Sequence, residues 1–338
     1  MTSGGAAMRQ IRAFGPQDLR MVETEDPVPG TGEVVVDVMA CGICGSDKWF
    51  WYVEGPHPYV AGHEAAGVVS AVGPGVRELR VGDRVAVNNV RGCGECEACR
   101  EEAYVRCTGG LSHMGFGFSE KIAVPERNCL KLHDAISFEQ GALIFDNWGT
   151  PYSALARTNM KAGDTVLVTG CGPIGLAAVG LCRQRGARVA AVDVLPARLA
   201  AAKRQGAEWT GAPGDGLADE LRKFAGKNGF DYVVECSGHP SSYDLGFEVI
   251  GMGGTIVVVG EKAEIRVNSS RIIHKHLTIT GSLYSTMPAG RAVQELMVRG
   301  EIDPMAFVTH TFRLEELPEK FGDVIEAKDG LIKAVVVR

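Results

Sequence analysis

The stretch that decides the fold is residues 164–175, which read DTVLVTGCGPIG. A short apolar run ends at Thr169, a glycine-rich turn follows, and apolar residues then recur with the period of a helix. Strand, glycine-rich turn and helix in this order are typical of a unit that binds a dinucleotide. In such a unit Gly170 allows a tight turn, Gly172 lets the backbone approach a pyrophosphate, and Gly175 lets the helix pack closely on the strand.

An acidic residue follows at the end of the next expected strand. Residues 188–193 form an apolar run, and its last residue, Asp193, lies 18 residues beyond Gly175. A carboxylate there can bind both ribose hydroxyls and would repel a 2′-phosphate, so we expect NAD rather than NADP as the cofactor. The alternative interpretation is a glycine-rich turn with an aspartate that caps a helix.

The pattern of expected strands and helices differs before and after residue 150. After it, a helix begins at Pro196 and strands are expected at 231–236, 255–260 and 277–280. This alternation predicts an α/β fold with a doubly wound parallel sheet. Before it, short strands expected at 33–39, 66–72 and 84–87 are separated by Gly and Pro, which predicts a β-rich, barrel-like domain. The tail holds an expected helix at 289–298 and a last strand at 332–337.

Composition sets limits on the class of protein. The chain has 338 residues, a net charge of −6 and 45% hydrophobic residues, which predicts two folded domains rather than a disordered chain. The acidic balance argues against nucleic acid as the main partner. No uncharged apolar run is long enough to span a membrane, and the first ten residues lack the apolar core of a secretory signal. We therefore expect a cytoplasmic protein whose ten cysteines are metal ligands or reduced thiols.

Four cysteines form the first candidate metal site. They are Cys93, Cys96, Cys99 and Cys107, with the spacing C-x2-C-x2-C-x7-C. Four thiolates complete a tetrahedral zinc site and leave no position open, which is typical of structural zinc. Such an ion would hold a lobe that has too few apolar residues to pack by itself. The alternative is a pair of disulfides, which a reducing compartment disfavours.

A second, smaller set of residues could hold a reactive metal. It consists of Cys44 and the pair His63-Glu64. A site with three protein ligands leaves a position for a substrate oxygen, as catalytic zinc requires. Cys41 competes with Cys44 as the thiolate ligand, and spacing alone does not separate them.

These motifs together resemble a known family. The order of the motifs resembles that of zinc-containing alcohol dehydrogenases of the medium-chain dehydrogenase/reductase superfamily. The motifs are the run from Gly62 to Gly67, then Gly73 and Val76, then the four-cysteine lobe and finally the nucleotide motif. The sequence is most similar to the polyol (sorbitol-type) and threonine dehydrogenase branches. The resemblance implies a GroES-like catalytic domain at 1–149, completed by 282–338, and a Rossmann NAD-binding domain at 150–281. It also implies two zinc ions per chain, one catalytic and one structural, and a homodimer or homotetramer.

The resemblance assigns roles to individual residues. It makes Cys44, not Cys41, the thiolate ligand of catalytic zinc, His63 the imidazole ligand, and Glu64 a neighbouring carboxylate that can exchange onto the metal. Asp146, which lies 24 residues before Gly170, matches the acidic third ligand, although the usual residue is the longer Glu. The remaining matches are Ser46 as proton acceptor, Asp47 as the carboxylate that orients His63, Thr150 and Ile174 beside the nicotinamide, Pro173 within the glycine motif, and Asp193 and Arg198 beside the adenosine ribose.

One position departs from the family pattern. Many members have a histidine five residues after the cysteine ligand, and this chain has Trp49 there. The proton from Ser46 would then leave through the ribose hydroxyls and water, or through another group such as His57. The alternative for His57 is a solvated loop histidine.

The expected reaction is reversible hydride transfer between an alcohol carbon and NAD. The aromatic run at 49–52 can pack on the C–H face of a sugar or cyclitol, although it can equally be core filler. Asn88 and Asn89 suit a polyhydroxylated substrate, so we expect a secondary alcohol of a sugar, polyol or cyclitol. The alternative substrate is a hydroxy amino acid such as threonine, with Arg91 as its carboxylate partner. A different class remains open, an inactive relative that binds a nucleotide or metabolite.

Overall fold

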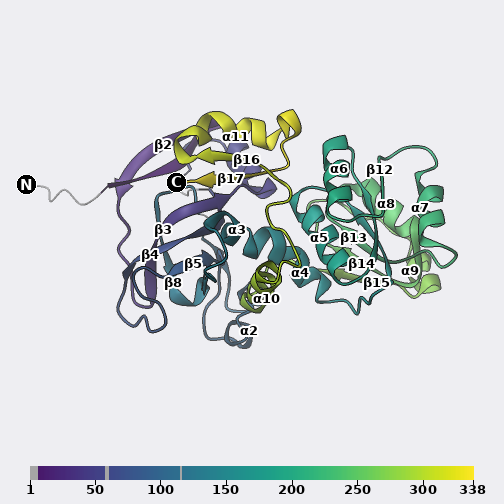
Figure 1. Cartoon of the computed structure of the whole chain (residues 1–338), viewed down its shortest axis with the longest axis horizontal. Coiled ribbons are helices and arrows are strands. Elements are labelled where there is room, and N and C mark those ends of the chain that lie inside the picture. Colours follow the sequence, from purple (N-terminus) through teal and green to yellow (C-terminus); the bar gives the residue numbers. More distant parts are fainter. Residues whose placement is uncertain (1–6, 58–60, 115) are drawn as a thin grey trace, which may run out of the picture. The chain divides into compact units, whose positions relative to one another are not determined.

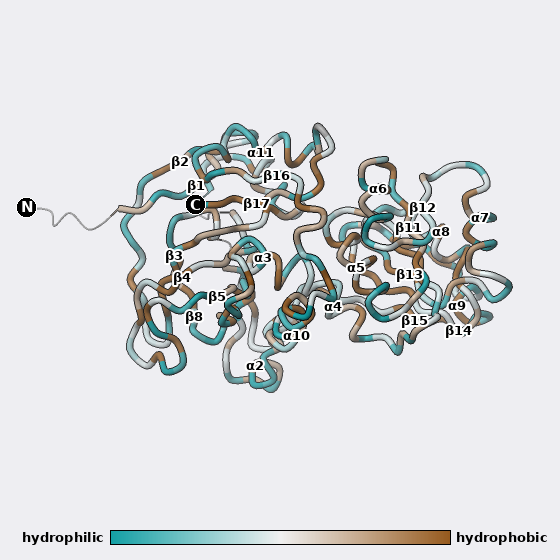
Figure 2. Tube along the Cα trace, viewed as in Figure 1, coloured by the Kyte–Doolittle hydropathy of each residue, from teal (hydrophilic) through white to brown (hydrophobic). Residues whose placement is uncertain are grey.

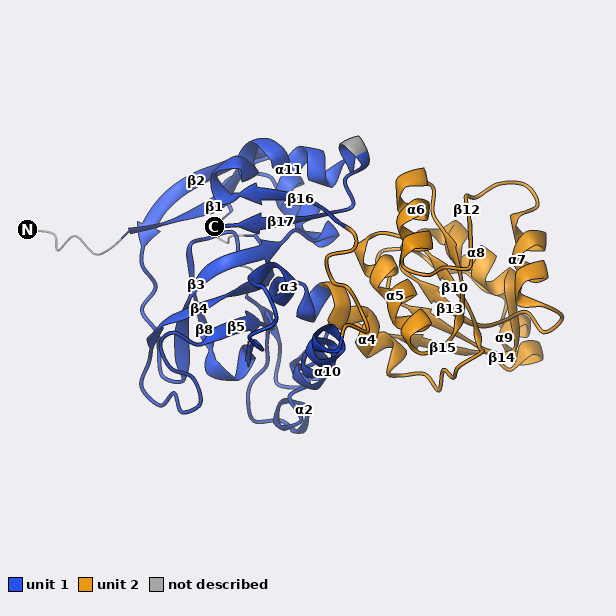
Figure 3. Ribbon diagram, in the orientation of Figure 1, with its two compact units in different colours: residues 1–146, 285–299, 308–338 blue, residues 147–284, 300–307 orange. Residues whose placement is uncertain are grey.

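The computed structural model describes residues 7–57, 61–114 and 116–338, which divide into two compact units (Figures 1 and 3). The first unit gathers the chain up to Asp146 with residues 285–299 and 308–338. The second gathers residues 147–284 and 300–307.

The units differ from the domains expected from the sequence at residues 147–149, 282–284 and 300–307, which were expected in the catalytic domain and group with the second unit. The largest of these differences is the segment 300–307. Within the second unit, Phe307 stacks on Trp148 with ring centroids 5.7 Å apart, and Gln184 donates a hydrogen bond to Glu301. These contacts explain why the segment groups there. The functional assignment of the two domains stays a prediction.

A seven-stranded sheet forms the centre of the first unit. Its order is β16-β17-β3-β4-β5-β9, with β8 also paired to β3. The strands are β3 (Glu33–Gly42), β4 (Glu64–Val72), β5 (Arg84–Val87), β8 (Lys121–Pro125), β9 (Cys129–Lys131), β16 (Val308–Arg313) and β17 (Lys333–Val337). Most pairs are antiparallel, and β17 joins the end of the chain to β3, where Val335 pairs with Gly42.

Two smaller sheets and several short helices complete this unit. The two-stranded sheets are β1 (Ala7–Gly15) with β2 (Asp18–Glu25), and β6 (Val90–Arg91) with β7 (Ser112–His113). The helices are α1 (Lys48–Tyr52), α2 (Glu97–Arg100), α3 (Phe138–Ala142), α10 (Met287–Val298) and α11 (Leu317–Ile325), with the 3₁₀ turns η1 (Gly45–Asp47), η2 (Tyr104–Arg106), η3 (Glu126–Asn128), η5 (Leu314–Glu316) and η6 (Lys328–Gly330). A π-helical turn, η4, spans Ile144–Trp148.

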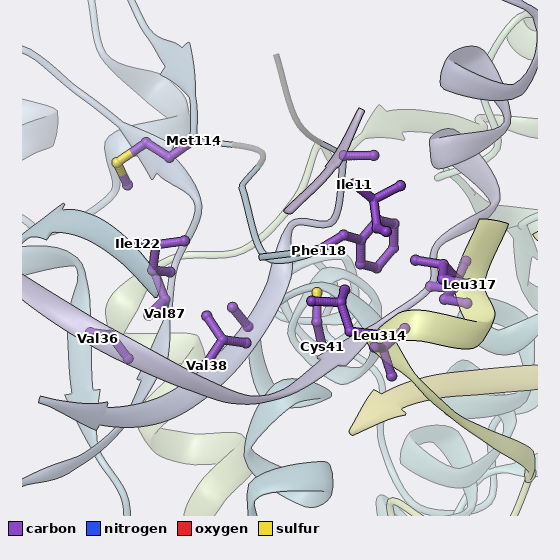
Figure 4. Packing of buried hydrophobic residues seen from close by; sticks show 14 of the residues in the cluster. Ile11, Val36, Val38, Cys41, Val87, Met114, Phe118, Ile122, Leu314 and Leu317 are labelled. Atoms are coloured by element: carbon purple, nitrogen blue, oxygen red, sulfur yellow. The ribbon is translucent and has the colours of Figure 1, made fainter. Parts of the chain in front are cut away.

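The core of the first unit lies against the valine-rich strands. Val34, Val36 and Val38 of β3 are buried, and Figure 2 shows β17 coloured as hydrophobic along much of its length. Figure 4 shows Cys41 among the apolar side chains of this core, which also include Phe118 and Leu314. Because β-branched residues fit a pleated, buried surface, this sequence favours strands here.

The second unit is a parallel sheet with helices between the strands. Its order is β12-β11-β10-β13-β14-β15, and every neighbouring pair is parallel. The strands are β10 (Thr165–Thr169), β11 (Arg188–Val192), β12 (Trp209–Gly211), β13 (Phe230–Glu235), β14 (Ile250–Val258) and β15 (Thr278–Gly281). The helices are α4 (Gly149–Leu155), α5 (Pro173–Gln184), α6 (Pro196–Arg204), α7 (Leu217–Ala225), α8 (Pro240–Val249) and α9 (Ser269–Lys275).

This topology confirms the predicted doubly wound sheet. The chain runs outward from β10 through β11 to β12 and then returns to the other side of β10 as β13. The strand order therefore reverses beside β10, and ligands of such sheets bind beyond the carboxyl ends of the strands at this point. All five residues of β10 are buried, as expected for a strand covered on both faces.

Among the described residues, none of the helices is both long and apolar enough to cross a membrane.

Candidate functional site

Four potential metal ligands lie together in the first unit. One donor atom each of Cys44, His63, Glu64 and Asp146 lies within 4.8 Å of the others. Cys44 immediately precedes η1, His63 and Glu64 stand at the start of β4, and Asp146 belongs to the π-helical turn. Turns of this kind occur frequently at functional sites. The structure thus brings together four residues that the sequence analysis singled out.

Two carboxylates contact the imidazole of His63 from opposite sides. Its Nδ1 atom lies 3.2 Å from Asp47 Oδ1, and its Nε2 atom lies 3.1 Å from Asp146 Oδ2. Asp47 is almost fully buried and also accepts a 2.9 Å hydrogen bond from the backbone N–H of Cys44. Asp47 therefore fixes both the ring of His63 and the backbone that carries Cys44, which is how outer carboxylates orient metal ligands.

The charges of this group act on one another strongly. Burial alone would lower the pKa of His63, but the carboxylates of Asp47 and Asp146 together raise it well above its usual value. Burial opposes the ionisation of Asp146, yet the hydrogen bond from His63 lowers the pKa of this carboxyl. His63 and Asp146 therefore favour their charged forms beside each other.

Glu64 has a partner that the sequence analysis missed, Lys333 of β17. The Nζ atom of Lys333 lies 2.5 Å from Glu64 Oε1 and donates a second hydrogen bond, 2.9 Å long, to the carbonyl oxygen of Ile43. Burial raises the pKa of Glu64 to about 7 despite the opposing effect of Lys333. A single lysine ahead of the run Ala334–Val337 was the only signal in the sequence.

Cys41 does not belong to the group, although it lies only three residues before Cys44. Its side chain is almost fully buried in the core of the first unit, and its Sγ atom contacts the carbonyl oxygen of Gly42 at 3.6 Å. Burial raises the pKa of both thiols, so the position of Cys41 in the core, rather than its acidity, separates it from Cys44.

The donor chemistry of the group fits zinc. A thiolate, an imidazole and carboxylates are the ligand types that zinc takes, with an open position in catalytic sites. Glu64 Oε2 is buried and has no hydrogen-bond partner among the described residues. A buried carboxylate oxygen without a hydrogen-bond partner is costly unless a nearby cation stabilises its charge.

The groups expected to act on the substrate lie beside these ligands in the sequence. Ser46 is exposed on η1, and Trp49 is half exposed on α1. The ring of Trp49 meets those of Phe50 and His57 edge to face, at centroid distances of 4.8 and 4.7 Å. These three rings form an aromatic cluster, whereas Trp51 is buried in the core.

Of the polar residues expected to suit the substrate, Asn88 and Arg91 have other partners, whereas Asn89 Oδ1 is buried without a hydrogen-bond partner among the described residues. Asn88 is fully buried, donates a hydrogen bond to the carbonyl of Ser285 and accepts one from the N–H of Val90. Its amide therefore fixes backbone rather than substrate. Arg91 lies 3.4 Å from Glu33, so its charge is partly compensated.

The four-cysteine lobe has the geometry of a zinc site. Its four Sγ atoms lie within 4.8 Å of one another, with 4.0 Å between Cys93 and Cys99 and 3.9 Å between Cys96 and Cys107. Sulfurs around tetrahedral zinc lie about 3.8 Å apart when the Zn–S bonds are about 2.3 Å long, whereas disulfide sulfurs lie about 2 Å apart. All four cysteines are free, so the disulfide alternative does not describe this structure.

Backbone donors favour the thiolate at Cys93 and Cys96, whereas burial raises the pKa of Cys99 to about 12. The N–H groups of Thr108 and Cys99 lower the pKa of Cys96 to about 5. Arg127 donates a 2.7 Å hydrogen bond to the carbonyl of Gly92, at the base of the lobe. Two of the four thiols are thus predisposed to lose their protons, and metal binding would release the proton of Cys99.

The glycine motif of the second unit leaves room for a ligand. Gly170 has a φ of 81°, which favours glycine, and a side chain at Gly175 would collide with the carbonyl oxygen of Gly170. At Gly172, by contrast, an added Cβ would meet nothing within 4 Å. Gly172 is also the N-cap of α5, whose first residue is Pro173. Free N–H groups at a helix N-terminus beside open space suit the phosphates of a dinucleotide.

Asp193 lies directly beside this turn. Its two carboxylate oxygens accept hydrogen bonds from the backbone N–H groups of Cys171, at 2.7 Å, and Leu195, at 2.8 Å. Arg198 lies 3.8 Å away. A carboxylate has about four acceptor positions, so Asp193 keeps capacity for hydroxyl donors. Thr150 stands on α4 and Ile174 in the first turn of α5.

Comparisons with known proteins identify related chains. Two family models match, "Alcohol dehydrogenase GroES-like domain" over residues 30–134 and "Zinc-binding dehydrogenase" over residues 173–299. A sorbitol dehydrogenase of Bacillus subtilis is 31% identical, with 97% of each chain covered. An L-threonine 3-dehydrogenase of Saccharopolyspora erythraea is 34% identical, with 93% of this chain and 94% of the relative covered. A solved Escherichia coli alcohol dehydrogenase in complex with NADH superposes with a TM-score of 0.89 at 30% identity, covering 99% of this chain and 100% of the other.

Proposed function

Because this chain belongs to the zinc-type alcohol dehydrogenase family, we propose that it transfers a hydride between a secondary alcohol of a sugar, polyol or cyclitol and NAD. The observation that carries this proposal is the group of four donors, Cys44, His63, Glu64 and Asp146, within 4.8 Å of one another. In this proposal the first unit is the catalytic domain and the second unit binds NAD. The chain acts as a homo-oligomer in the cytoplasm.

The two donor groups would bind two different zinc ions. Cys44, His63 and Asp146 would hold catalytic zinc, and Glu64 would be a neighbouring carboxylate that can exchange onto the metal. Cys93, Cys96, Cys99 and Cys107 would hold structural zinc. When bound at the first site, zinc acts as a Lewis acid that lowers the pKa of a hydroxyl group.

The residues around the catalytic site have different roles, and one of them would accept the proton of the substrate. Asp47 keeps His63 in the orientation that directs Nε2 towards the other donors. Ser46, which is exposed on η1, accepts the hydroxyl proton at Oγ. Trp49 cannot relay it, because its indole carries a donor and no acceptor. The proton would instead pass from Ser46 to ribose hydroxyls and water, or through another group such as His57.

The second unit supplies the cofactor site. The N-terminus of α5 binds the pyrophosphate, and Gly172 gives it open space. The carboxylate of Asp193 binds the ribose hydroxyls and repels a 2′-phosphate, which favours NAD over NADP.

The aromatic cluster of Trp49, Phe50 and His57 supports a ring-shaped or polyhydroxylated substrate. Exposed aromatic faces pack on the C–H surface of sugars, whereas a small alkyl alcohol would leave these aromatic rings exposed to solvent. The 31% identity to a sorbitol dehydrogenase supports the same class.

A hydroxy amino acid is the second candidate substrate. The 34% identity to an L-threonine 3-dehydrogenase favours it. The contact of Arg91 with Glu33 disfavours it, because that arginine is then partly neutralised before it meets a substrate carboxylate. An inactive binding protein would have no reason to keep Cys44, His63 and Asp146 in ligating positions.

A substrate panel tests the proposal. Zinc-loaded protein is mixed with NAD and, separately, with polyols, sugars, cyclitols, threonine and simple alcohols, and NADH absorbance is followed. We expect the highest kcat/KM with a polyol, sugar or cyclitol. The highest value with threonine would instead establish the second candidate.

A further inference from the structure

Lys333 is a buried lysine at the start of an otherwise apolar strand. It begins β17, whose other residues are Ala334, Val335, Val336 and Val337, and its side chain is only 1% exposed. Fully buried lysines are rare unless they are paired, because burying an ammonium group is costly. The strand carries this lysine into the first unit's interior, beside β3.

Both contacts of Lys333 lead to the candidate metal centre. Its Nζ atom contacts Glu64 Oε1 at 2.5 Å and the carbonyl oxygen of Ile43, the residue before Cys44, at 2.9 Å. Glu64 has the same 1% exposure as Lys333. The lysine therefore fixes one oxygen of a candidate ligand and the backbone next to another.

The other oxygen of Glu64 lies in restricted space. Oε2 has no hydrogen-bond partner among the described residues, and a side chain at Gly42 would collide with it. Since Gly42 also pairs with Val335 in the sheet, the strand that carries Lys333 and the strand that makes room for Glu64 are joined. This packing limits the movement of Oε2 towards Gly42 and leaves Lys333 as the contact that retains Oε1.

The charges explain why a cation is needed there. A Cys44 thiolate, Glu64, Asp146 and the buried Asp47 beside His63 bring four negative charges to a site that a doubly charged zinc ion would only partly neutralise. Lys333 supplies one further positive charge. A buried carboxylate without such a partner would be strongly destabilising.

We propose that Lys333 is a positioning residue of the metal centre, which holds Glu64 beside the metal but prevents it from becoming a permanent ligand. This inference rests on the proposed function in that Cys44, His63, Glu64 and Asp146 must form the zinc site. By retaining one oxygen of Glu64 and neutralising its charge, Lys333 leaves a position on the metal for substrate.

The test measures zinc release rather than turnover. Four zinc-loaded proteins, the wild type, Lys333→Met, Glu64→Gln and the double variant, are mixed with a chromophoric chelator, and the rate of zinc loss is recorded. A Cys44→Ser variant, which keeps only the four-cysteine site, identifies the phase that belongs to the lobe. Methionine preserves the length of the lysine side chain and removes its charge.

The direction in which the rate of zinc release changes distinguishes a positioning role of Lys333 from a merely structural one. Without Lys333, Glu64 is free to bind the metal and a repelling cation is gone, so zinc release from the Cys44 site should slow at least about fivefold. The kcat should fall at the same time. In the Glu64→Gln background the same lysine replacement should leave zinc release unchanged, since the carboxylate it acts on is absent.

Two results would overturn the inference. One is faster or unchanged zinc release in Lys333→Met, as expected when the lysine only supports the fold. The other is an equal effect of Lys333→Met with and without Glu64→Gln.

Folding failure is also informative. Should Lys333→Met fail to fold, recovery of a folded protein in the double variant supports the pairing with Glu64, and failure of both variants contradicts it. Because zinc release needs no substrate, a wild type that shows the expected zinc pattern but reduces no NAD would refute the proposed function alone.

Discussion

His63 Nε2 lies 3.1 Å from Asp146 Oδ2, although 83 residues separate the two in the sequence. Asp146 reaches the imidazole from a π-helical turn, and one of its oxygens lies within 4.8 Å of a donor atom of Cys44. The shorter acid therefore lies close enough to the other donors to be considered as a ligand itself.

Replacing Asp146 by asparagine should weaken the catalytic zinc site. The variant loses a charged donor, so we expect zinc retention at this site and kcat to fall at least about tenfold. Metal analysis after dialysis and steady-state kinetics measure the two effects. Asp146→Glu keeps the charge and is the matched control, expected to retain more zinc than Asp146→Asn. Equal zinc content in all three proteins would exclude Asp146 from the ligand set.

Asp47→Asn should reduce catalysis while leaving cofactor binding intact. The replacement keeps the shape of the side chain but removes the carboxylate that lies 3.2 Å from His63 Nδ1. Loss of such a partner reduces activity or metal affinity roughly 10–100-fold. Fluorescence titration with NADH should give the wild-type Kd, because the glycine motif belongs to the other unit. An unchanged kcat would mean that Asp47 has no role in orienting His63.

Cys96→Ser should remove the structural zinc and unfold the lobe. The lobe depends on its metal, so we expect a loss of more than about 3 kcal/mol in stability of the first unit. Limited proteolysis should cut between residues 92 and 109, and metal analysis should find one zinc fewer. Cys129→Ser, which changes a partly buried thiol outside both donor groups, is the control and should keep both ions. A protease-resistant lobe without zinc would contradict the assignment.

Asp193→Ser should relax the choice between NAD and NADP. Removing the carboxylate removes both the ribose partner and the repulsion of a 2′-phosphate, and Arg198 remains nearby. The ratio of kcat/KM for NAD to that for NADP should fall at least about tenfold. Asp219→Ser changes an exposed carboxylate of the same unit and should leave the ratio unchanged. A wild type that already used both cofactors equally would contradict the role of Asp193.

Local patterns explain what could be predicted from the sequence. The strand, turn and helix around Gly170 and the spacing to Asp193 are short-range features, and the parallel sheet confirms them. The four cysteines of the lobe lie within fifteen residues, so their spacing alone indicated one site. The resemblance to zinc-type alcohol dehydrogenases is likewise confirmed by the two family models.

Features that depend on distant packing were not predictable in this way. Spacing could not separate Cys41 from Cys44, because only the fold shows that one thiol faces the core and the other the donor group. The contact between Lys333 and Glu64 joins residues 269 positions apart. Asn88 was expected to suit a substrate because amides bind hydroxyl groups, but its amide donates to the carbonyl of Ser285 and accepts from the N–H of Val90, which only the structure could reveal.

The most direct test of the central claim compares wild type with Cys44→Ser in one assay. Both proteins are loaded with zinc, their bound zinc is counted, and NADH formation is measured with the best substrate of the panel. The account predicts two zinc ions and measurable turnover for the wild type, but one zinc ion and a rate at least about 1000-fold lower for Cys44→Ser. A Cys44→Ser protein that keeps two zinc ions, or that turns over at the wild-type rate, would contradict it.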